Sequence, residues 1–158
     1  MKTLLCAAFF AATFLPGMMA VSQNLTRQPG CANASILLQA DSMKQLFSNQ
    51  GFIVVKEASI KMESEFEMPV IVPLIESVLY QFIFIGDASS RLYEVRMFDW
   101  DEKQVAYQKK ELGDMDVNVI SLAYTPRISE YHMMKPVQVN NDKKNLCGYV
   151  LLLKKVSQ

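Results

Sequence analysis

The sequence predicts a mainly β protein: a jelly-roll-like antiparallel β-sandwich of about eight strands, preceded by one amphipathic helix. Three observations support this. Apolar and polar residues alternate through most of the chain after Gly51, which is the period of strands with one buried face. The segments between these runs are short and rich in turn-forming residues, as in hairpins. Strands and helices do not alternate, which argues against a parallel doubly wound sheet.

The first 22 residues have the pattern of a cleavable secretory signal peptide. Lys2 precedes an apolar run over residues 4–15, and the small residues Ala20 and Ser22 suit a signal peptidase. The mature chain would then begin at Gln23; a cut after Ala20 is the alternative. A run of about a dozen apolar residues is too short to cross a bilayer core of roughly 30 Å. We therefore expect an exported protein, periplasmic or secreted, with no membrane span.

The mature chain begins with a polar segment and one helix. Residues 23–34 contain a Pro-Gly turn signal and are expected to form a flexible lead-in. From residue 35 to residue 48, apolar side chains recur at helical spacing, with Asn33 or Ser35 as the N-cap and an end near residues 49–51. Residues 35–158 are expected to form a single domain. The apolar stripe of the helix consists of Ile36, Ala40, Met43 and Phe47, widened by Leu37 and Leu38.

Eight strand segments follow the helix. The segment 60–72 alternates apolar and mostly acidic residues, and Pro69 and Pro73 place its second half at a sheet edge or a bend. The segment 78–85 is apolar on both faces, so we expect it at the centre of a sheet. The remaining strands are expected near residues 52–55, 92–98, 104–107, 117–124, 131–139 and 146–153.

Two cysteines remain after removal of the signal peptide, since cleavage also removes Cys6. Cys31 and Cys147 are a plausible disulfide, because exported proteins mature in an oxidising compartment. The bond would join the N-terminal segment to the last strand across a very long loop. In the chain-entropy model, such a closure contributes about 4–5 kcal/mol. Two buried free thiols are the alternative.

Composition and charge argue against several classes of function. The full chain has 16 basic and 16 acidic residues, which is unlike a nucleic-acid-binding or polybasic membrane-surface protein. The single histidine, His132, lacks the partners that a zinc site or a catalytic triad requires, and we expect it on the surface. We therefore expect no enzyme, no catalytic residues and no cofactor. Calcium is the one metal for which a case can be made.

Six short runs follow one another along the expected strands, at residues 79–86, 93–99, 104–107, 120–126, 130–133 and 147–151. Their order resembles that of small exported β-sandwich proteins of the Bacteroidota, which are largely uncharacterised. It is more distantly similar to the bacterial prepeptidase C-terminal sandwich domain. The resemblance extends over residues 33–155 and implies the fold and the export, without a common activity or site residues.

The acidic run with a central tryptophan at residues 99–102 is the best candidate for a ligand site. Trp100 is the only tryptophan of the chain, and on a hairpin tip its ring could stack on a sugar or anchor a protein. A ring folded over the end of the sandwich is the alternative. Asp99 and Asp101 could share a calcium ion, although calcium requires about six oxygen ligands and aspartate is common in metal-free turns.

These observations predict a non-enzymatic exported module that binds a protein or glycan in the cell envelope or outside the cell. Trp100, Asp99 and Asp101 are its expected ligand-binding residues. A calcium-dependent, C2-like surface binder is one alternative. A hydrolase that uses carboxylates is another, and it would require two carboxylates in one cleft.

Overall fold

The computed structural model describes residues 30, 31 and 33–156, in which one helix precedes eight strands. The expected signal peptide and residues 23–29 lie outside the described residues. No helix of the described part is long and apolar enough to cross a membrane. The elements are α1 (Ala34–Asn49), β1 (Phe52–Glu63), β2 (Val70–Leu74), β3 (Tyr80–Gly86), β4 (Leu92–Phe98), β5 (Gln104–Glu111), β6 (Val119–Tyr124), β7 (Glu130–Val139) and β8 (Asn145–Lys155).

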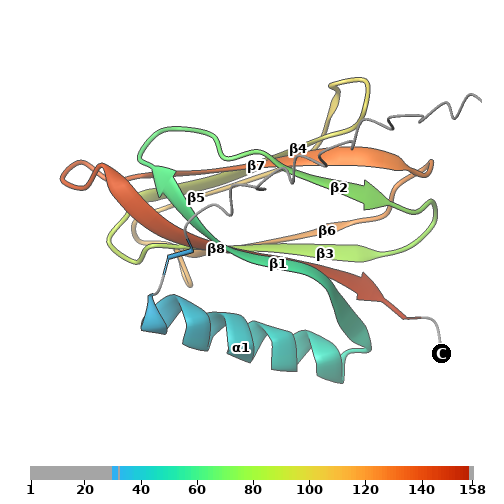
Figure 1. The fold of residues 1–158 in the computed structure, drawn as a ribbon, viewed down its shortest axis with the longest axis horizontal. Coiled ribbons are helices and arrows are strands. Elements are labelled where there is room, and N and C mark those ends of the chain that lie inside the picture. The colour runs from blue at the N-terminus through green and yellow to red at the C-terminus, as the bar shows by residue number, and fades with distance from the viewer. Residues whose placement is uncertain (1–29, 32, 157–158) are drawn as a thin grey trace, which may run out of the picture.

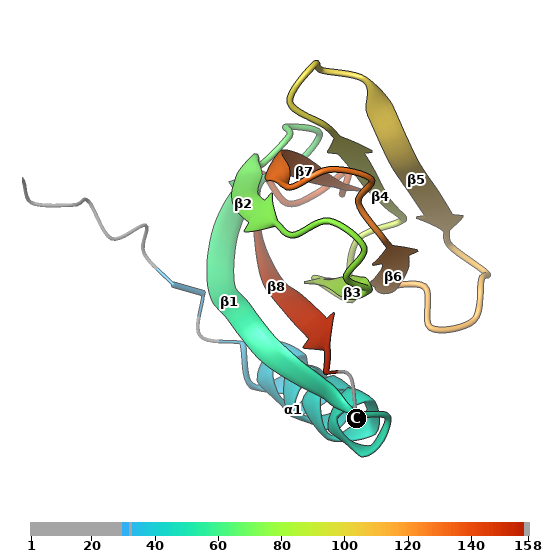
Figure 2. The same ribbon diagram turned by 90° about the vertical axis from the view of Figure 1, so that its right-hand side faces the viewer.

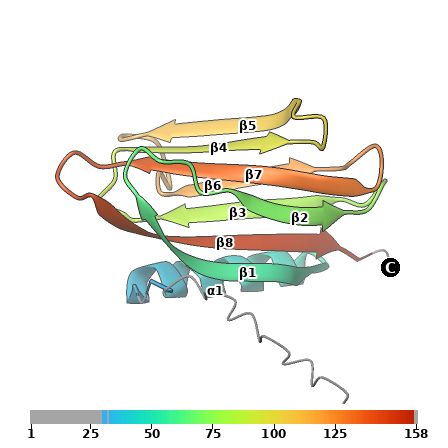
Figure 3. The same ribbon diagram turned by 45° about the horizontal axis from the view of Figure 1, so that its top comes forward.

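The strands form two four-stranded antiparallel sheets that pack face to face (Figures 1 and 2). The first sheet has the order β1-β8-β3-β6 and the second has the order β2-β7-β4-β5. The pairs β1–β8, β2–β7, β3–β6 and β4–β5 are therefore nested within one another along the chain. This nesting is the topology of a jelly roll, which confirms the predicted fold class. Figure 3 shows that the strands of both sheets run roughly along the long axis of the molecule.

The main core lies between the two sheets. Strand β3 is buried along its whole length and has β8 and β6 as neighbours, which confirms its predicted central place. Its side chains Phe82 and Phe84 meet the inward residues of the second sheet. The most fully buried members of this core include Phe82, Phe84, Tyr93, Val95, Met97, Ile120 and Met134.

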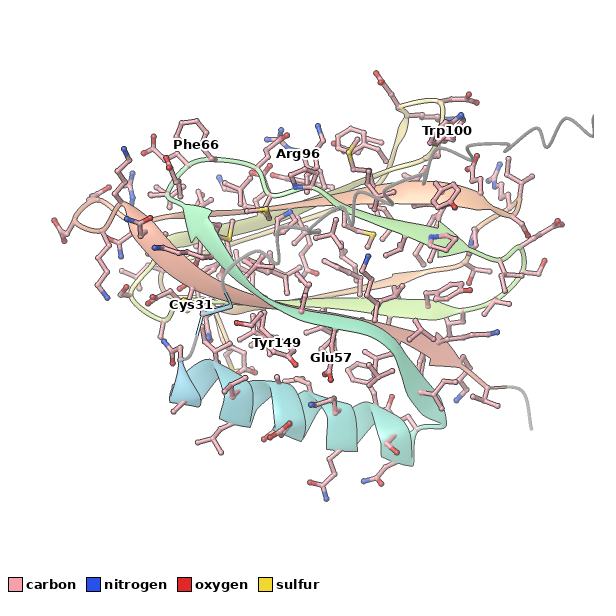
Figure 4. All side chains as sticks on the ribbon, viewed as in Figure 1. Cys31, Glu57, Phe66, Arg96, Trp100 and Tyr149 are labelled. Atoms are coloured by element: carbon pink, nitrogen blue, oxygen red, sulfur yellow. A yellow bond between two sulfur atoms is a disulfide. The ribbon has the colours of Figure 1, made fainter. Side chains whose placement is uncertain are left out.

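Helix α1 covers the outer face of the first sheet and forms a second apolar cluster there (Figure 1). The Oδ1 atom of Asn33 accepts hydrogen bonds from the backbone N–H groups of Ser35 and Ile36, so Asn33, one of the two predicted candidates, is the N-cap. On the sheet, the hydroxyl of Tyr149 donates to Glu57, whose carboxylate also pairs with Lys44 of the helix. Figure 4 shows Tyr149 and Glu57 between the sheet and the helix.

A disulfide joins Cys31 to Cys147 of β8, with 5.4 Å between their Cα atoms, and confirms the predicted pairing. Ser59 of β1 anchors the same segment, because its hydroxyl accepts from the backbone N–H of Cys31 and donates to the carbonyl of Cys31. The chain before α1 is therefore fixed to two neighbouring strands of the first sheet.

The region between residues 52 and 74 differs from the expectation. Strand β1 runs without a break from Phe52 to Glu63, with a bulge between Val54 and Lys56. The chain then leaves the first sheet through a turn in which Glu65 has a φ of +74°, and β2 begins in the second sheet at Val70. The expected single segment 60–72 is thus divided between two sheets, and its second half lies in the edge strand β2, one of the two places that Pro69 and Pro73 predicted.

Candidate ligand-binding site at the β4–β5 turn

The turn between β4 and β5 is closed by the side chain and backbone of Asp99. Its backbone N–H donates to the carbonyl of Lys103 over 3.0 Å, and its Oδ1 accepts from the Lys103 N–H over 2.8 Å. The Glu102 N–H donates to the Asp99 carbonyl over 3.2 Å, and Glu102 has a φ of +60°. The expected hairpin at residues 99–103 is therefore confirmed, and Asp99 supplies its local hydrogen bonds.

Trp100 extends from this turn and is 69% exposed. Its ring lies 6.2 Å from the ring of Tyr131 in β7, with an angle of 50° between the two planes. This contact holds the indole against the beginning of β7 without burying it. Figure 4 shows Trp100 near one end of the second sheet and Phe66 near the other, with Arg96 between them.

Trp100 and Tyr131 line a small apolar pocket of about 190 Å³, which we call the Trp100 pocket. Ile71 of β2 and Met133 of β7 lie opposite each other in the sheet and form its aliphatic wall. Its lining residues are Ile71, Asp99, Trp100, Glu102, Tyr131, His132 and Met133. The pocket opens on the face of the second sheet that faces away from the core and from α1.

The inward and outward faces of strand β7 are the reverse of those we expected. The clearest case is His132. We expected a surface histidine, but His132 is 1% exposed and points toward the core with Met134. Its Nε2 lies 3.2 Å from the hydroxyl of Tyr124, and its Nδ1 lies 3.4 Å from the Glu130 carbonyl. Because these partners satisfy the ring, β7 can bury it and expose Tyr131 instead.

A polar groove of about 440 Å³ lies on the other side of the same turn, and we call it the Arg127 groove. Asp99 lines both depressions, whereas Asp101 lines only this one. Burial raises the pKa of Tyr124, which also lines the groove, and the nearby charges of Asp99 and Glu130 add to the effect. The groove is lined by Asp99, Asp101, Lys103, Gln104, Val105, Tyr124, Thr125, Arg127, Ile128 and Glu130.

The remainder of this sheet face is charged, and its carboxylates are paired. Arg96 contacts Glu94 through its Nε, and its Nη1 lies 3.3 Å from the Glu67 carboxylate. The Nζ of Lys135 lies 3.0 Å from the other oxygen of Glu67 and 5.1 Å from the centre of the Phe98 ring. The face therefore divides into a neutralised charged part and the Trp100 pocket.

The structure brings together only part of the predicted site. Asp99 and Trp100 line one pocket, while Asp101 lies on the opposite side of the turn. Within residues 30–31 and 33–156, no group of three or more histidine, cysteine, aspartate or glutamate side chains could hold a metal ion.

Sequence reasoning missed Tyr131, Ile71, Met133 and Glu102. One signal was present: Ile71 is apolar at a position where the alternation of residues 60–72 otherwise places charged residues and prolines. An apolar residue on an outward row marks an exposed apolar patch. The pairing of β2, which contains Ile71, with β7 could not be predicted from the alternation of residues along the chain.

Comparisons with known proteins identify no family. No protein-family model and no curated protein matches the chain. A chain from Bacillus endospore appendages, described as a novel family of disulfide-linked pili, is 9% identical, covers 68% of this chain and 89% of its own, and has a TM-score of 0.36. An arabinose-bound α-L-arabinofuranosidase is 10% identical, with coverages of 66% and 23% and a TM-score of 0.34. Similarity at this level assigns no function to the chain.

Proposed function

We propose that this chain is an exported, non-enzymatic β-sandwich module that binds a segment of a protein partner in the Trp100 pocket. The partner would be in the cell envelope or outside the cell. The observation that carries the proposal is an exposed apolar pocket, lined by two aromatic and two aliphatic side chains, beside a charged and internally paired surface. Tryptophan and tyrosine are the residues most enriched at the centres of protein interfaces.

The size and lining of the pocket favour a protein side chain over a glycan. Small-molecule sites usually have volumes of about 300–1,000 Å³, whereas this pocket has about 190 Å³. An apolar cavity of about 150 Å³ accommodates benzene, so one leucine or phenylalanine side chain is the matching size. A sugar site requires convergent polar groups. Ile71 and Met133 offer none, and the charged groups of the lining are two carboxylates, those of Asp99 and Glu102.

The pocket is also held in place before a ligand arrives. Ile71, Tyr131 and Met133 lie on paired strands, and the turn that carries Trp100 is closed by three hydrogen bonds at Asp99. A preorganised surface loses little conformational entropy on binding. Export is supported by the N-terminal sequence pattern, and the Cys31–Cys147 disulfide fits an oxidising compartment.

A capture experiment tests the proposal. Mature protein from Gln23 onward is immobilised and exposed to an envelope extract, and bound proteins are identified by mass spectrometry. We expect a specific partner that Trp100→Ala depletes by about tenfold or more, as for an interface hot spot. Phe66→Ala is the matched control, because Phe66 is an aromatic residue of similar exposure, 65%, at the far end of the sheet.

Two outcomes would contradict the proposal. One is equal capture by wild type and the Trp100→Ala variant. The other is capture of polysaccharide alone, which free sugar then displaces from the protein. That result would show that the site binds a glycan.

A carboxylate-dependent hydrolase is the second candidate, because Asp99, Asp101 and Glu130 share the Arg127 groove. Hydrolysis of glycosides requires two carboxyl groups that flank one bond. The test is release of chromophore from a panel of aryl glycosides by wild type, Glu130→Gln and Asp101→Asn. Turnover that both substitutions abolish would replace the binding function with this one.

A further inference from the structure

We infer that the segment bound in the Trp100 pocket presents a bulky apolar side chain with a lysine or arginine next to it. This inference rests on the proposed function and specifies the chemistry of the partner. The apolar side chain follows from the volume of the pocket and its four apolar walls. The basic neighbour follows from the charges around those walls.

The only charged residues that line the pocket are Asp99 and Glu102. Neither carboxylate forms an ion pair with another residue of the described part of the chain. By contrast, Glu94 and Glu67 on the same sheet face are each paired with Arg96 or Lys135. The rim of the pocket therefore has two negative charges that a partner can neutralise, and such complementarity selects partners and accelerates association.

The cations nearest to this turn and to the wall of the pocket face elsewhere or are already engaged. Lys103 and Arg127 line the groove on the opposite side of the turn. The Nζ of Lys56 donates to the carbonyl of Ile71 over 3.1 Å. Lys135 is bound to Glu67. Among the described residues, none of these four cations lines the pocket, although Lys103 and Arg127 share the Arg127 groove with Asp99. Glu102 is therefore the carboxylate of the pocket that shares neither depression with a cation.

Glu102 occupies a backbone position that normally favours glycine. Its φ of +60° lies in the left-handed region, where a side chain with a Cβ is disfavoured. Glu65, Ser77 and Asp116 also have a positive φ and none of them lines the pocket, so this conformation alone marks no site. Here the disfavoured residue supplies one of the two carboxylates on the rim.

Trp100 provides the measurement, because it is the only tryptophan of the chain and lines the pocket. Three synthetic peptides are titrated while its emission is followed: Gly-Lys-Phe-Lys-Gly, Gly-Glu-Phe-Glu-Gly and Gly-Lys-Ala-Lys-Gly, each with blocked ends. We expect the first to bind about tenfold more tightly than each of the other two, and its advantage over the acidic peptide to shrink in high salt. The first comparison isolates charge and the second isolates the apolar side chain.

Substitutions that remove one negative charge test which carboxylate attracts the basic peptide. Glu102→Gln is expected to reduce the preference for the basic phenylalanine peptide about threefold while the emission of Trp100 in the free protein is unchanged. Asp101→Asn is the matched control, since Asp101 lies in the same turn but lines the other groove. Equal effects of the two substitutions would overturn the assignment of Glu102.

Failure of the inference and failure of the proposed function are separable. If the extract yields a partner that depends on Trp100 but the acidic and basic peptides bind alike, the charge inference is wrong and the binding function stands. If no peptide alters the emission of Trp100 and capture is insensitive to Trp100→Ala, both are wrong.

Discussion

The rings of Trp100 and Tyr131 lie 6.2 Å apart and are inclined by 50°, so they meet as two tilted walls. The first ring belongs to the β4–β5 turn and the second to the outward face of β7. Aromatic pairs at this separation contribute about 0.5–1.5 kcal/mol beyond the area they bury. The contact explains how a tryptophan that is mostly exposed can form one side of a defined pocket.

Glu102→Gly should raise the free energy of unfolding by about 0.5–1 kcal/mol, because glycine adopts a positive φ without a steric penalty. The same substitution removes a rim carboxylate and should weaken binding of the basic phenylalanine peptide. Urea unfolding and Trp100 emission measure the two effects on one sample. A variant that is less stable than wild type would show that Glu102 contributes contacts that outweigh its backbone strain.

Gly86→Ala should destabilise the protein strongly, by about 3 kcal/mol, because the core there has no room for a methyl group. A Cβ at this position would lie 2.5 Å from Cε1 of Tyr93 and 2.9 Å from Oε1 of Gln138. Gly30→Ala is the control, since its nearest neighbour would be Ser59 at 3.8 Å. Chemical unfolding of both variants checks the prediction, and similar midpoints for the two would refute it.

Removal of the disulfide should lower the free energy of unfolding by up to about 4–5 kcal/mol, because the bond closes a very long loop. The bonded cysteines are separated by 116 residues. Urea unfolding of wild type and the Cys31→Ser, Cys147→Ser double variant, without reductant, gives the difference. Denatured, unreduced mature protein should also contain no titratable thiol, and two thiols per chain would show that the bond does not form.

Alkaline pH should destabilise the fold through Tyr93. Burial raises the pKa of Tyr93 to about 12, and the charge of Asp87 adds to this, whereas an unfolded tyrosine titrates near 10. Between these values the native state keeps a proton that the unfolded state has lost, so stability falls as pH rises, by about 1.4 kcal/mol per pH unit. Burial also raises the pKa of Tyr149, which acts in the same direction.

Tyr93→Phe isolates this contribution. The variant should be less stable than wild type at neutral pH, because the hydroxyl donates to the carbonyls of Asp87 and Ser90. Between pH 10 and pH 12, however, its stability should fall less steeply. Parallel slopes for the two proteins across this range would contradict the assignment to Tyr93.

Much of the fold could be predicted from local pattern. Strand β4 has the predicted bounds, Leu92–Phe98, because strict alternation and the turn signals on either side leave no other register. The disulfide could be predicted because Cys31 and Cys147 are the two cysteines outside the expected signal peptide. The crossing between β1 and β2 was harder to place, since one alternating pattern continues through residues 60–72 although the strand changes sheet at residues 64–69.

The orientation of β7 and the composition of the Trp100 pocket could not be predicted from the local pattern of the sequence. Tyr131 and Met133 look like core residues in the alternation, but His132 takes the inward place because Tyr124 of another strand satisfies its ring. Ile71 and Met133 meet only through strand pairing. The sequence identified Trp100 and Asp99 as candidates because both lie in one turn, where neighbours in sequence are neighbours in space.

Photo-crosslinking in cells that produce the protein tests directly whether the Trp100 pocket contacts a protein partner. A benzoylphenylalanine crosslinker would be placed at Met133, in the wall of the pocket, and in a second strain at Phe66, at the far end of the same sheet. We expect one defined protein adduct from position 133 and none from position 66. Equal adducts from both positions, or an adduct from position 66 alone, would contradict it.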